Sequence, residues 1–364
     1  MAELVRRDTV AISDGFLSHP IYVLGREPKG TSELVSGLID TGNGSFQCTR
    51  SGSKIHSHEI NAIADPGDVF FSNRTGTSLR TALSQRAVQN TLLVTEQCDN
   101  NCTFCSQPPR DVPDYYDLAI AALSEFEGSG VIGVSGGEPT IHWEKFIGLL
   151  SCESARRRPF HVLTHGRVLS RADRVGEMQA HGIIDSVLFG IPIHGASART
   201  HDAVTGVDGS WEETIQGLIN LRHIDAALEI RIIITEQILD GLDSVLALLH
   251  SILGSSGYRV ALMRLEPTGW ARGHLNLLRP SISREAAIID YVTLNAGVRG
   301  QQVSLYNYPL CLISEAAREF ACKSISDWKN VYPEQCNTCS LKPQCSGLFA
   351  SERNRVVEKL RPVI

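Results

Sequence analysis

The sequence predicts an α/β protein in which six strand–helix units lie between a small β-rich domain and a cysteine-rich tail. Three observations support this prediction. Residues 1–85 are rich in Gly, Ser and Thr, apolar strand patterns alternate with amphipathic helix patterns in residues 86–299, and five of the ten cysteines fall in residues 300–364. The expected domains are therefore 1–85, 86–299 and 300–364.

The N-terminal region is typical of short strands separated by turns. The segments PIYVLGR (20–26) and DPGDVFFSNRTG (65–76) are apolar runs bounded by Gly, Pro, Asp or Asn. Apolar runs of this length indicate strands, and the bounding residues indicate turns. We therefore expect a small β-rich domain in residues 1–85.

The middle of the chain alternates between two patterns. Continuous apolar runs predict strands at 91–95, 131–135, 160–164, 186–193, 228–235 and 259–265. Helical spacing of apolar residues appears between them, around 118–126, 146–150, 215–219 and 245–249. Apolar strands that alternate with amphipathic helices predict a parallel sheet covered by helices. This periodicity fits a doubly wound sheet and a partial barrel equally well.

Charge and composition indicate which partners and which compartment to expect. The chain of 364 residues has a net charge of −6 and no long run of like charge, which argues against nucleic acid or an anionic membrane as a partner. The N-terminus lacks the apolar core of a signal peptide, and no apolar stretch is long enough to span a bilayer, so we expect a cytoplasmic protein. Cysteines in that compartment rarely form disulfides, and their clustering favours metal sites.

The first cysteine cluster lies directly after the first strand of the middle region. TEQCDNNCTFCSQPP has the spacing C-x3-C-x2-C at Cys98, Cys102 and Cys105. Three thiolates can bind a 4Fe–4S cluster and leave one iron open. That iron can chelate S-adenosylmethionine (SAM), and the cluster can then supply the electron that cleaves it. Structural zinc usually has four ligands in paired knuckles, and no second pair lies nearby.

A second motif, SGGEPT, follows the second strand of the middle region. Loops at the carboxyl ends of parallel strands meet at one edge of the sheet, so both motifs should face one pocket. Gly136 and Gly137 allow a close backbone approach to a ligand, and Glu138 can accept hydrogen bonds from the SAM ammonium group. The SAM-binding residues that we expect are Phe104, Ser135, Gly136, Gly137, Glu138, Pro139, Thr164 and Arg231. Further candidates are His165, Gly166 and His194, although a buried core histidine or a surface ion pair would explain the polar ones equally well.

The tail holds a second cysteine set after a strand expected at 302–306. Cys336, Cys339 and Cys345 have the spacing C-x2-C-x5-C, and a fourth ligand must come from upstream. Cys311 follows an extended segment and is the expected choice, whereas Cys322 lies in a helical pattern and could pack as a buried thiol. Four cysteines suit zinc or a closed 4Fe–4S cluster. We favour an auxiliary 4Fe–4S cluster, because the first site already requires iron–sulfur assembly.

Together these motifs resemble the radical SAM maturases of His-Xaa-Ser peptide systems, of the C-type. The matching stretches are TEQCDNNCTFCSQPP, SGGEPT, HDAVTGVDGSWEETIQGLINL, LEIRIII, LEPTGWAR, SISDWKN and the terminal cysteines. The chain departs from the family where Cys-Gly-Gly-Phe-Phe is expected and Cys345-Ser346-Gly347-Leu348-Phe349 stands, and Cys322 falls where no ligand is expected. Residues 1–59 match weakly.

The resemblance implies a partial (β/α)6 TIM-like radical SAM barrel, with Phe104 packed near the adenine. It implies an enzyme that reductively cleaves SAM to a 5′-deoxyadenosyl radical and modifies a ribosomally made peptide with His-Xaa-Ser repeats. The implied partners are this precursor peptide, a second radical SAM maturase and a reductant of the flavodoxin or ferredoxin type.

Two other functions remain open. One is a radical SAM enzyme that acts on a small molecule or an RNA base, although the acidic balance argues against RNA. The other is a non-catalytic iron–sulfur or zinc protein that senses redox state or binds a partner. The SGGEPT motif argues against it, because a sensor does not need SAM.

Overall fold

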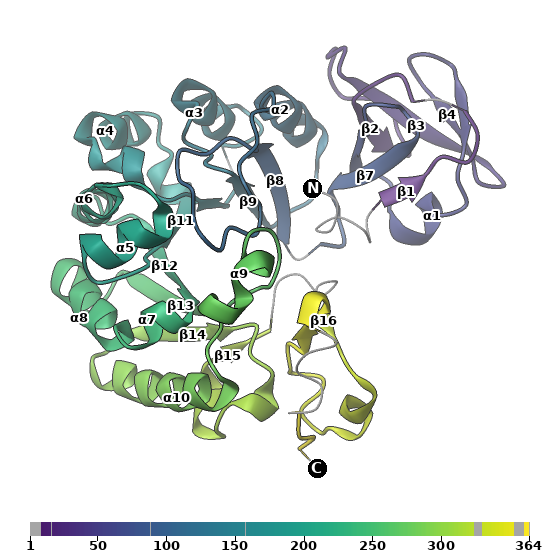
Figure 1. Cartoon of the computed structure of the whole chain (residues 1–364). Helices are drawn as coiled ribbons and strands as arrows, with labels where there is room; N and C mark the ends of the chain where they lie inside the picture. The colour runs from purple at the N-terminus through teal and green to yellow at the C-terminus, as the bar shows by residue number, and fades with distance from the viewer. Residues whose placement is uncertain are drawn as a thin grey trace. The chain divides into compact units, whose positions relative to one another are not determined.

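The computed structural model describes residues 9–15, 17–87, 89–156, 158–323, 330–352 and 360–363 (Figure 1). The chain divides into two compact units. Unit 1 comprises Met1–Gln97, Asp111–Val162 and His181–Ser186, and unit 2 comprises Cys98–Arg110, Leu163–Ala180 and Val187–Ile364. The division into the ranges 1–85, 86–299 and 300–364 stays a prediction.

Unit 1 begins with a sheet of short strands, coloured purple to blue in Figure 1. The strands are β1 (Thr9–Ala11), β2 (Ile21–Leu24), β3 (Val35–Gly42), β4 (Ser45–Cys48), β5 (Lys54–His56), β6 (Val69–Ser72) and β7 (Ser78–Leu83), with helix α1 (Ile60–Ile63). Their order in the sheet is β1-β7-β6-β2-β3-β4-β5. β2 and β3 pair in parallel, and the other neighbours pair antiparallel.

The two ends of this sheet meet, so that it forms a small barrel. Just after β1, the Ser13 amide donates to the His56 carbonyl, and the His56 amide donates to the Asp14 carbonyl, both at 2.9 Å. These bonds join the chain after β1 to β5, the strand at the other end of the order. Tyr22 and Phe46 are fully buried in the core of this barrel. Closure satisfies backbone groups that an open edge would leave unpaired.

The rest of unit 1 carries the first strand–helix units. These are β8 (Gln89–Thr95), α2 (Tyr116–Glu125), β9 (Val131–Gly136), α3 (Trp143–Ser151), β10 (Phe160–Leu163), whose last residue belongs to unit 2, and the 3₁₀ turn η2 (Ile184–Ser186). β8 pairs with β9, and β9 pairs with β10, both in parallel. Val94 and Val134 are fully buried on these strands, as are Leu123 and Phe146 on the two helices.

Unit 2 continues the alternation. Its elements up to the tail are η1 (Arg167–Ser170), α4 (Ala172–Ala180), β11 (Val187–Pro192), α5 (Ala198–Thr205), α6 (Ser210–His223), β12 (Ala227–Ile234), α7 (Glu236–Leu239), α8 (Leu242–Leu253), β13 (Tyr258–Arg264), α9 (Ala271–Leu278), α10 (Ile282–Val298) and β14 (Gln302–Tyr306). All pairs from β11 to β14 are parallel. Each strand predicted in the middle region is present within two residues of its predicted ends, so the α/β class is confirmed.

The tail of unit 2 is built from short elements. They are η3 (Leu310–Leu312), η4 (Ala316–Phe320), β15 (Ala321–Cys322), β16 (Asn330–Val331), η6 (Glu334–Thr338), β17 (Leu348–Phe349) and η7 (Ala350–Glu352). Cys322 lies on a two-residue strand beside β14, where the sequence pattern predicted a helix. The SISDWKN stretch falls outside the described residues except for the backbone of Asn330. Among the described helices, none combines the length and apolarity that crossing a membrane requires.

Candidate functional site

The loop of the first cysteine cluster is held by hydrogen bonds within unit 2. The Cys105 amide donates to the Cys102 carbonyl at 3.0 Å, which folds the loop into a turn. Asn101 donates its amide to the Thr205 carbonyl at 2.7 Å, and Thr103 donates to the Val204 carbonyl at 3.0 Å. The end of helix α5 therefore supports the middle of the cysteine loop.

The chemistry of the three thiols fits a metal cluster. Cys98, Cys102 and Cys105 are partly buried and form no disulfide. Burial, and then the neighbouring Cys105, raise the pKa of the Cys102 thiol to about 12, and burial raises the pKa of Cys105. Thiolates in this loop need positive charge beside them, which the iron of a 4Fe–4S cluster supplies. These cysteines can hold such a cluster.

Phe104 anchors the cysteine loop in an apolar cluster. Its side chain is buried and packs with Val204, Leu265 and the α9 residues Ala271, Leu275 and Leu278. Its ring also meets the ring of His194 edge-on, with centroids 5.2 Å apart. The anchoring role therefore accounts for Phe104 within unit 2, and a contact with adenine stays a prediction.

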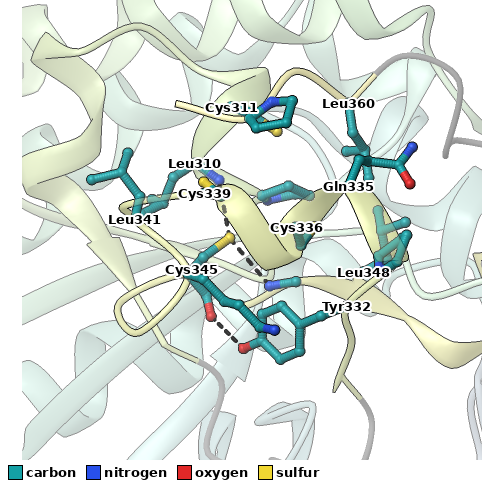
Figure 2. A pocket seen from close by; sticks show the side chains of 15 residues that line it. Leu310, Cys311, Tyr332, Gln335, Cys336, Cys339, Leu341, Cys345, Leu348 and Leu360 are labelled. Carbon is teal, nitrogen blue, oxygen red and sulfur yellow. Dashed lines mark hydrogen bonds between the residues drawn. The ribbon is translucent and has the colours of Figure 1, made fainter. Parts of the chain in front are cut away.

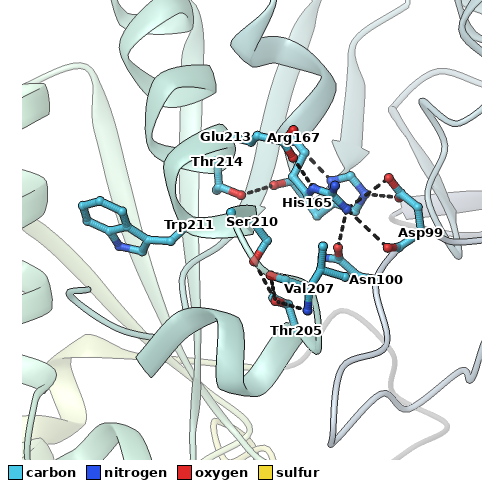
Figure 3. A network of polar contacts seen from close by, with 12 residues as sticks. Asp99, Asn100, His165, Arg167, Thr205, Val207, Ser210, Trp211, Glu213 and Thr214 are labelled. Atoms are coloured by element: carbon cyan, nitrogen blue, oxygen red, sulfur yellow. Dashed lines mark hydrogen bonds and ion pairs between the residues drawn. The ribbon is translucent and has the colours of Figure 1, made fainter. Parts of the chain in front are cut away.

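A polar clamp holds the start of the cysteine loop (Figure 3). His165 Nε2 lies 2.6 Å from Asp99 Oδ1, and the Arg167 amide donates to His165 Nδ1 at 3.2 Å. Because Nδ1 accepts, the ring proton is on Nε2 and is donated to the Asp99 carboxylate. Arg167 Nη1 donates to Asp99 Oδ2 at 3.1 Å and to Asn100 Oδ1 at 2.8 Å.

Helix α6 supports this clamp from behind. Glu213 accepts from Arg167 Nε at 2.5 Å, and Thr214 Oγ1 donates to the His165 carbonyl at 3.1 Å. Burial opposes ionisation of Asp99, yet the hydrogen bond from His165 and the charge of Arg167 hold its pKa at about 2. The donor atoms of Cys98, Asp99 and His165 all lie within 4.8 Å of one another. The clamp therefore fixes the loop next to its first cysteine.

The SGGEPT turn in unit 1 is bound to the end of β8. The Gly137 amide donates to the Thr95 carbonyl at 2.9 Å, and the Glu138 amide donates to the Gln97 carbonyl at 2.8 Å. A Cβ on Gly137 would lie 2.2 Å from the Gln97 carbonyl oxygen, where no atom fits. Glycine is therefore required here by the backbone that leads into Cys98, whatever a ligand requires in addition.

The remaining residues of this turn stabilise it internally. Ser135 and Gly136 end strand β9, beside Leu93 and Thr95 of β8. The Glu138 carboxylate is buried and accepts from the amide of Thr140 at 2.9 Å and from its hydroxyl at 2.6 Å. The Pro139 carbonyl accepts from the Tyr116 hydroxyl. A SAM contact by any residue of the turn stays a prediction.

Thr164 and Arg231 both lie in unit 2. Thr164 is buried, and its hydroxyl accepts from the Gly166 amide at 3.1 Å. Arg231 Nη1 lies 3.0 Å from Glu229 Oε1, on the face of β12 opposite to the buried side chains of Leu228, Ile230, Ile232 and Ile234. Burial lowers the pKa of Arg231, and Glu229 opposes that shift. An internal ion pair therefore accounts for Arg231, and its expected contact with SAM stays a prediction.

The tail cysteines gather around one cavity, shown in Figure 2. Cys311, Cys336, Cys339 and Cys345 line it, and Cys322 is not among the lining residues. The Cys345 sulfur accepts from the amides of Leu310 at 3.4 Å and Gly347 at 3.3 Å. Burial raises the pKa of Cys311 and Cys336. Four convergent thiols suit a closed cluster or a zinc ion.

Asp99, Arg167 and Glu213 are the site residues that sequence reasoning missed. They come from three separated segments: Asp99 occupies an unspecified position inside the cysteine motif, and Arg167 and Glu213 stand in no motif that carries chemistry. The only available signal was His165, which the sequence placed near the pocket through its position after a strand.

Comparison with known proteins identifies proteins to which parts of this chain are similar. Residues 92–235 match the family model described as the Radical SAM superfamily. The chain is 26% identical over 183 residues to the AdoMet-dependent heme synthase of Methanosarcina barkeri (strain Fusaro / DSM 804), covering 48% of this chain and 50% of that protein. It is 32% identical over 152 residues to the pre-heme d1 synthase of Dinoroseobacter shibae (strain DSM 16493 / NCIMB 14021 / DFL 12), covering 40% and 36%. The chain thus spans half or less of these curated relatives.

Solved structures of similar fold include anSMEcpe with bound AdoMet and the Cp18Cys peptide. That match covers 72% of this chain and 90% of the other, with 14% sequence identity and a TM-score of 0.51. At this identity the likeness shows the fold alone. It agrees with the family match, and the fold class expected from the sequence is confirmed.

Proposed function

We propose that this chain, whose residues 92–235 match the Radical SAM superfamily, is a radical SAM enzyme that modifies a ribosomally made peptide. The proposed substrate carries His-Xaa-Ser repeats, and a second radical SAM maturase acts beside this chain. A flavodoxin or ferredoxin supplies the electrons. We propose that the enzyme works in the cytoplasm.

One observation carries the assignment of the cofactor residues. A loop with three cysteines and a Gly-Gly-Glu-Pro turn both adjoin the carboxyl end of β8, the first by covalent continuation and the second by hydrogen bonds to Thr95 and Gln97. In this proposal Cys98, Cys102 and Cys105 hold the cluster, which supplies the electron for SAM cleavage. Asp99, His165 and Arg167 orient the loop, and the turn orients SAM.

Three observations support a peptide as the substrate. The resemblance to the His-Xaa-Ser maturases depends on SQPP and SISDWKN. It also covers LEPTGWAR, whose Gly269 and Trp270 contact the backbone of Cys105. The chain also has a closed β-barrel before its radical SAM domain and a cysteine-lined tail after it. anSMEcpe, of similar fold, was solved with a peptide bound.

A second candidate function comes from the curated relatives. One of these is named an AdoMet-dependent heme synthase and another a pre-heme d1 synthase, so a small-molecule substrate of the tetrapyrrole class is the alternative. The two candidates differ in what must be supplied for turnover. A peptide enzyme needs a His-Xaa-Ser repeat, and a tetrapyrrole enzyme does not.

The test incubates the reconstituted protein with SAM, dithionite and a His-Xaa-Ser repeat peptide under anaerobic conditions. We expect a SAM-dependent change in peptide mass, located by tandem mass spectrometry. The matched controls are the Cys98/Cys102/Cys105→Ala variant and a peptide with each repeat His replaced by Ala. Turnover of a porphyrin precursor together with an unchanged peptide mass would favour the alternative.

A further inference from the structure

The geometry points to helix α9 as a mechanical link between the two cysteine sites, with Glu352 as the positioning residue that holds it. The inference rests on the proposed function only in assigning metal centres to the two cysteine sets. All of the contacts involved lie within unit 2.

The N-terminal end of α9 supports the first cysteine loop. The Trp270 amide donates to the Cys105 carbonyl at 2.9 Å. Gly269, at φ +53°, lies so close beneath the loop that a Cβ there would be 2.3 Å from the Cys105 carbonyl oxygen. Phe104 packs on the apolar face of the helix, against Ala271 and Leu275. A shift of α9 must therefore move Cys105 or break these contacts.

The C-terminal end of α9 is fixed by a buried carboxylate from the tail. Arg279, the residue that caps α9, is paired with Glu352, and Arg264 at the end of β13 lies 2.5 Å from the same carboxylate. The side chain of Glu352 is 0% exposed and that of Arg264 is 3% exposed. Glu285 lies 3.8 Å from Arg264 and balances the second guanidinium charge.

The same network adjoins the second cysteine site at two points. Glu352 follows Cys345 by seven residues, and between them Leu348 lines the cavity of the tail cysteines. Tyr308 precedes Cys311 by three residues, and it is buried beside Glu285 and Arg264. Both tail ligands are thus joined to the buried ion pairs through short, ordered segments.

These contacts form a continuous path from one site to the other. The eight residues of α9 span about 12 Å at 1.5 Å per residue, and a helix of this length moves as a rigid body. A buried ion pair does not stretch gradually, because separating its members leaves uncompensated charge in the core. A metal centre bound at the tail site holds Glu352 in place. Glu352 then holds the C-terminal end of α9, and the N-terminal end of α9 holds the backbone of Cys105.

The first test measures hydrogen exchange at the Trp270 amide and in residues 98–110, with and without reconstituted clusters. E352Q should speed exchange at Trp270 on the order of tenfold, since it removes the charge that holds both arginines. E334Q alters an exposed carboxylate of the same tail and should leave exchange unchanged. Iron content and far-UV circular dichroism show that each variant is folded and loaded.

The second test asks whether the tail acts through Glu352. Replacing Cys336 and Cys339 by Ala should speed exchange at Trp270 as E352Q does. Combining both changes should add nothing further, because the effects share one path. Additive effects, or unchanged exchange at Trp270 in folded E352Q, would overturn the link.

If E352Q does not fold, the Arg279→Lys variant keeps the charge and loses the planar fork, and it should show a smaller effect in the same direction. Unchanged exchange at Trp270 in a folded Arg279→Lys variant would then overturn the link. The exchange measurement does not use SAM, so its outcome is independent of the proposed function. If the unmodified chain does not cleave SAM, the proposed function is wrong, and the exchange rates still decide whether α9 links the two sites.

Discussion

At the scale of single residues, Gly137 affects the cluster site through its contact with the backbone of Gln97. A methyl group at this position would meet the Gln97 carbonyl oxygen at 2.2 Å, and Gln97 is joined directly to Cys98. The residue therefore fixes the entry to the cysteine loop.

We predict that Gly137→Ala loses most of the iron at the first site, measured as iron and sulfide per chain in a protein whose tail cysteines are replaced. The control is Gly148→Ala on α3, where a Cβ meets nothing within 4 Å. That change should keep the iron and stabilise the helix by up to about 1 kcal/mol. Equal iron in both variants would contradict this role.

Two buried histidines make stability depend on pH. Burial lowers the pKa of His194 to about 3, and burial lowers the pKa of His201 to about 4. Both rings are therefore neutral in the folded protein near pH 7. Their stabilisation is full above the unfolded pKa near 6.5 and is lost as pH falls from there toward the folded values.

His201→Asn should therefore reduce acid sensitivity. Asn can still accept from the His194 amide, as His201 Nδ1 does at 3.2 Å, but it does not titrate. Between pH 7.5 and 5.5, the iron-free variant should lose about 1 kcal/mol less unfolding free energy than the unmodified protein. Urea denaturation at the two pH values measures this. An identical loss in both proteins would count against a neutral buried ring.

Among single residues, sequence reasoning succeeded where chemistry and local spacing coincide. Cys98, Cys102 and Cys105 stand in one motif, so their shared loop followed from the spacing. Asp99, His165 and Arg167 meet only after β10 has formed, and no local pattern pairs residues 66 positions apart. The role of Gly137 in backbone contact was likewise hidden, because the sequence does not show that Gln97 lies beside it.

At the scale of elements, the N-terminal barrel is fixed to helix α2 by Glu125. This carboxylate ends α2, is 1% exposed, and accepts from Arg26 Nη1 at 3.0 Å and from the Lys29 amide at 2.9 Å. These contacts lie within unit 1. The Gly30 amide donates to the same carboxylate at 3.4 Å. Since three donors converge on one buried group, the group is costly to remove.

Glu125→Ala should lower the free energy of unfolding by about 3 kcal/mol, because it leaves the Arg26 charge and two amides without their acceptor. Chemical denaturation measures the loss. The control is Glu127→Ala two residues later, which removes a pair with Lys29 that is largely exposed and should change stability much less. Comparable losses would show that Glu125 does not support the barrel.

The positions of Cys311 and Cys322 in the tail favour Cys311 as the fourth ligand of the second cysteine site. Cys311 lines the cavity with Cys336, Cys339 and Cys345, whereas Cys322 lies on β15 beside Tyr306. In a protein that lacks the first triplet, Cys311→Ala should lose the second cluster and Cys322→Ala should keep it, as judged by Mössbauer spectra and iron counting. The reverse result would exchange the ligands, and zinc in place of iron would change the cofactor.

Strand positions could be predicted more fully than the contacts between elements. Parallel strands buried on both faces give continuous apolar runs, so β11, β12 and β13 were found within one residue of their ends. The closure of the N-terminal barrel was not predicted, because it depends on Asp14 meeting His56 across 42 residues. Cys322 was placed on a helix by its local pattern, but pairing with β14 makes it a strand.

At the scale of the whole molecule, the domain family followed from two motifs and was confirmed by the family match over residues 92–235. The substrate did not follow in the same way. It depends on surfaces that bind another molecule, and no spacing of residues in this chain encodes those surfaces. The peptide assignment therefore depends on resemblance, while the SAM assignment depends on residues that can be replaced one at a time.

The central claim is that Cys98, Cys102 and Cys105 support reductive cleavage of SAM. The most direct measurement is anaerobic formation of 5′-deoxyadenosine from SAM and dithionite by the reconstituted protein, followed by liquid chromatography. We predict formation by the unmodified chain and none above background by the Cys98/Cys102/Cys105→Ala variant, with iron still present at the tail site. Equal formation by both proteins would contradict the account.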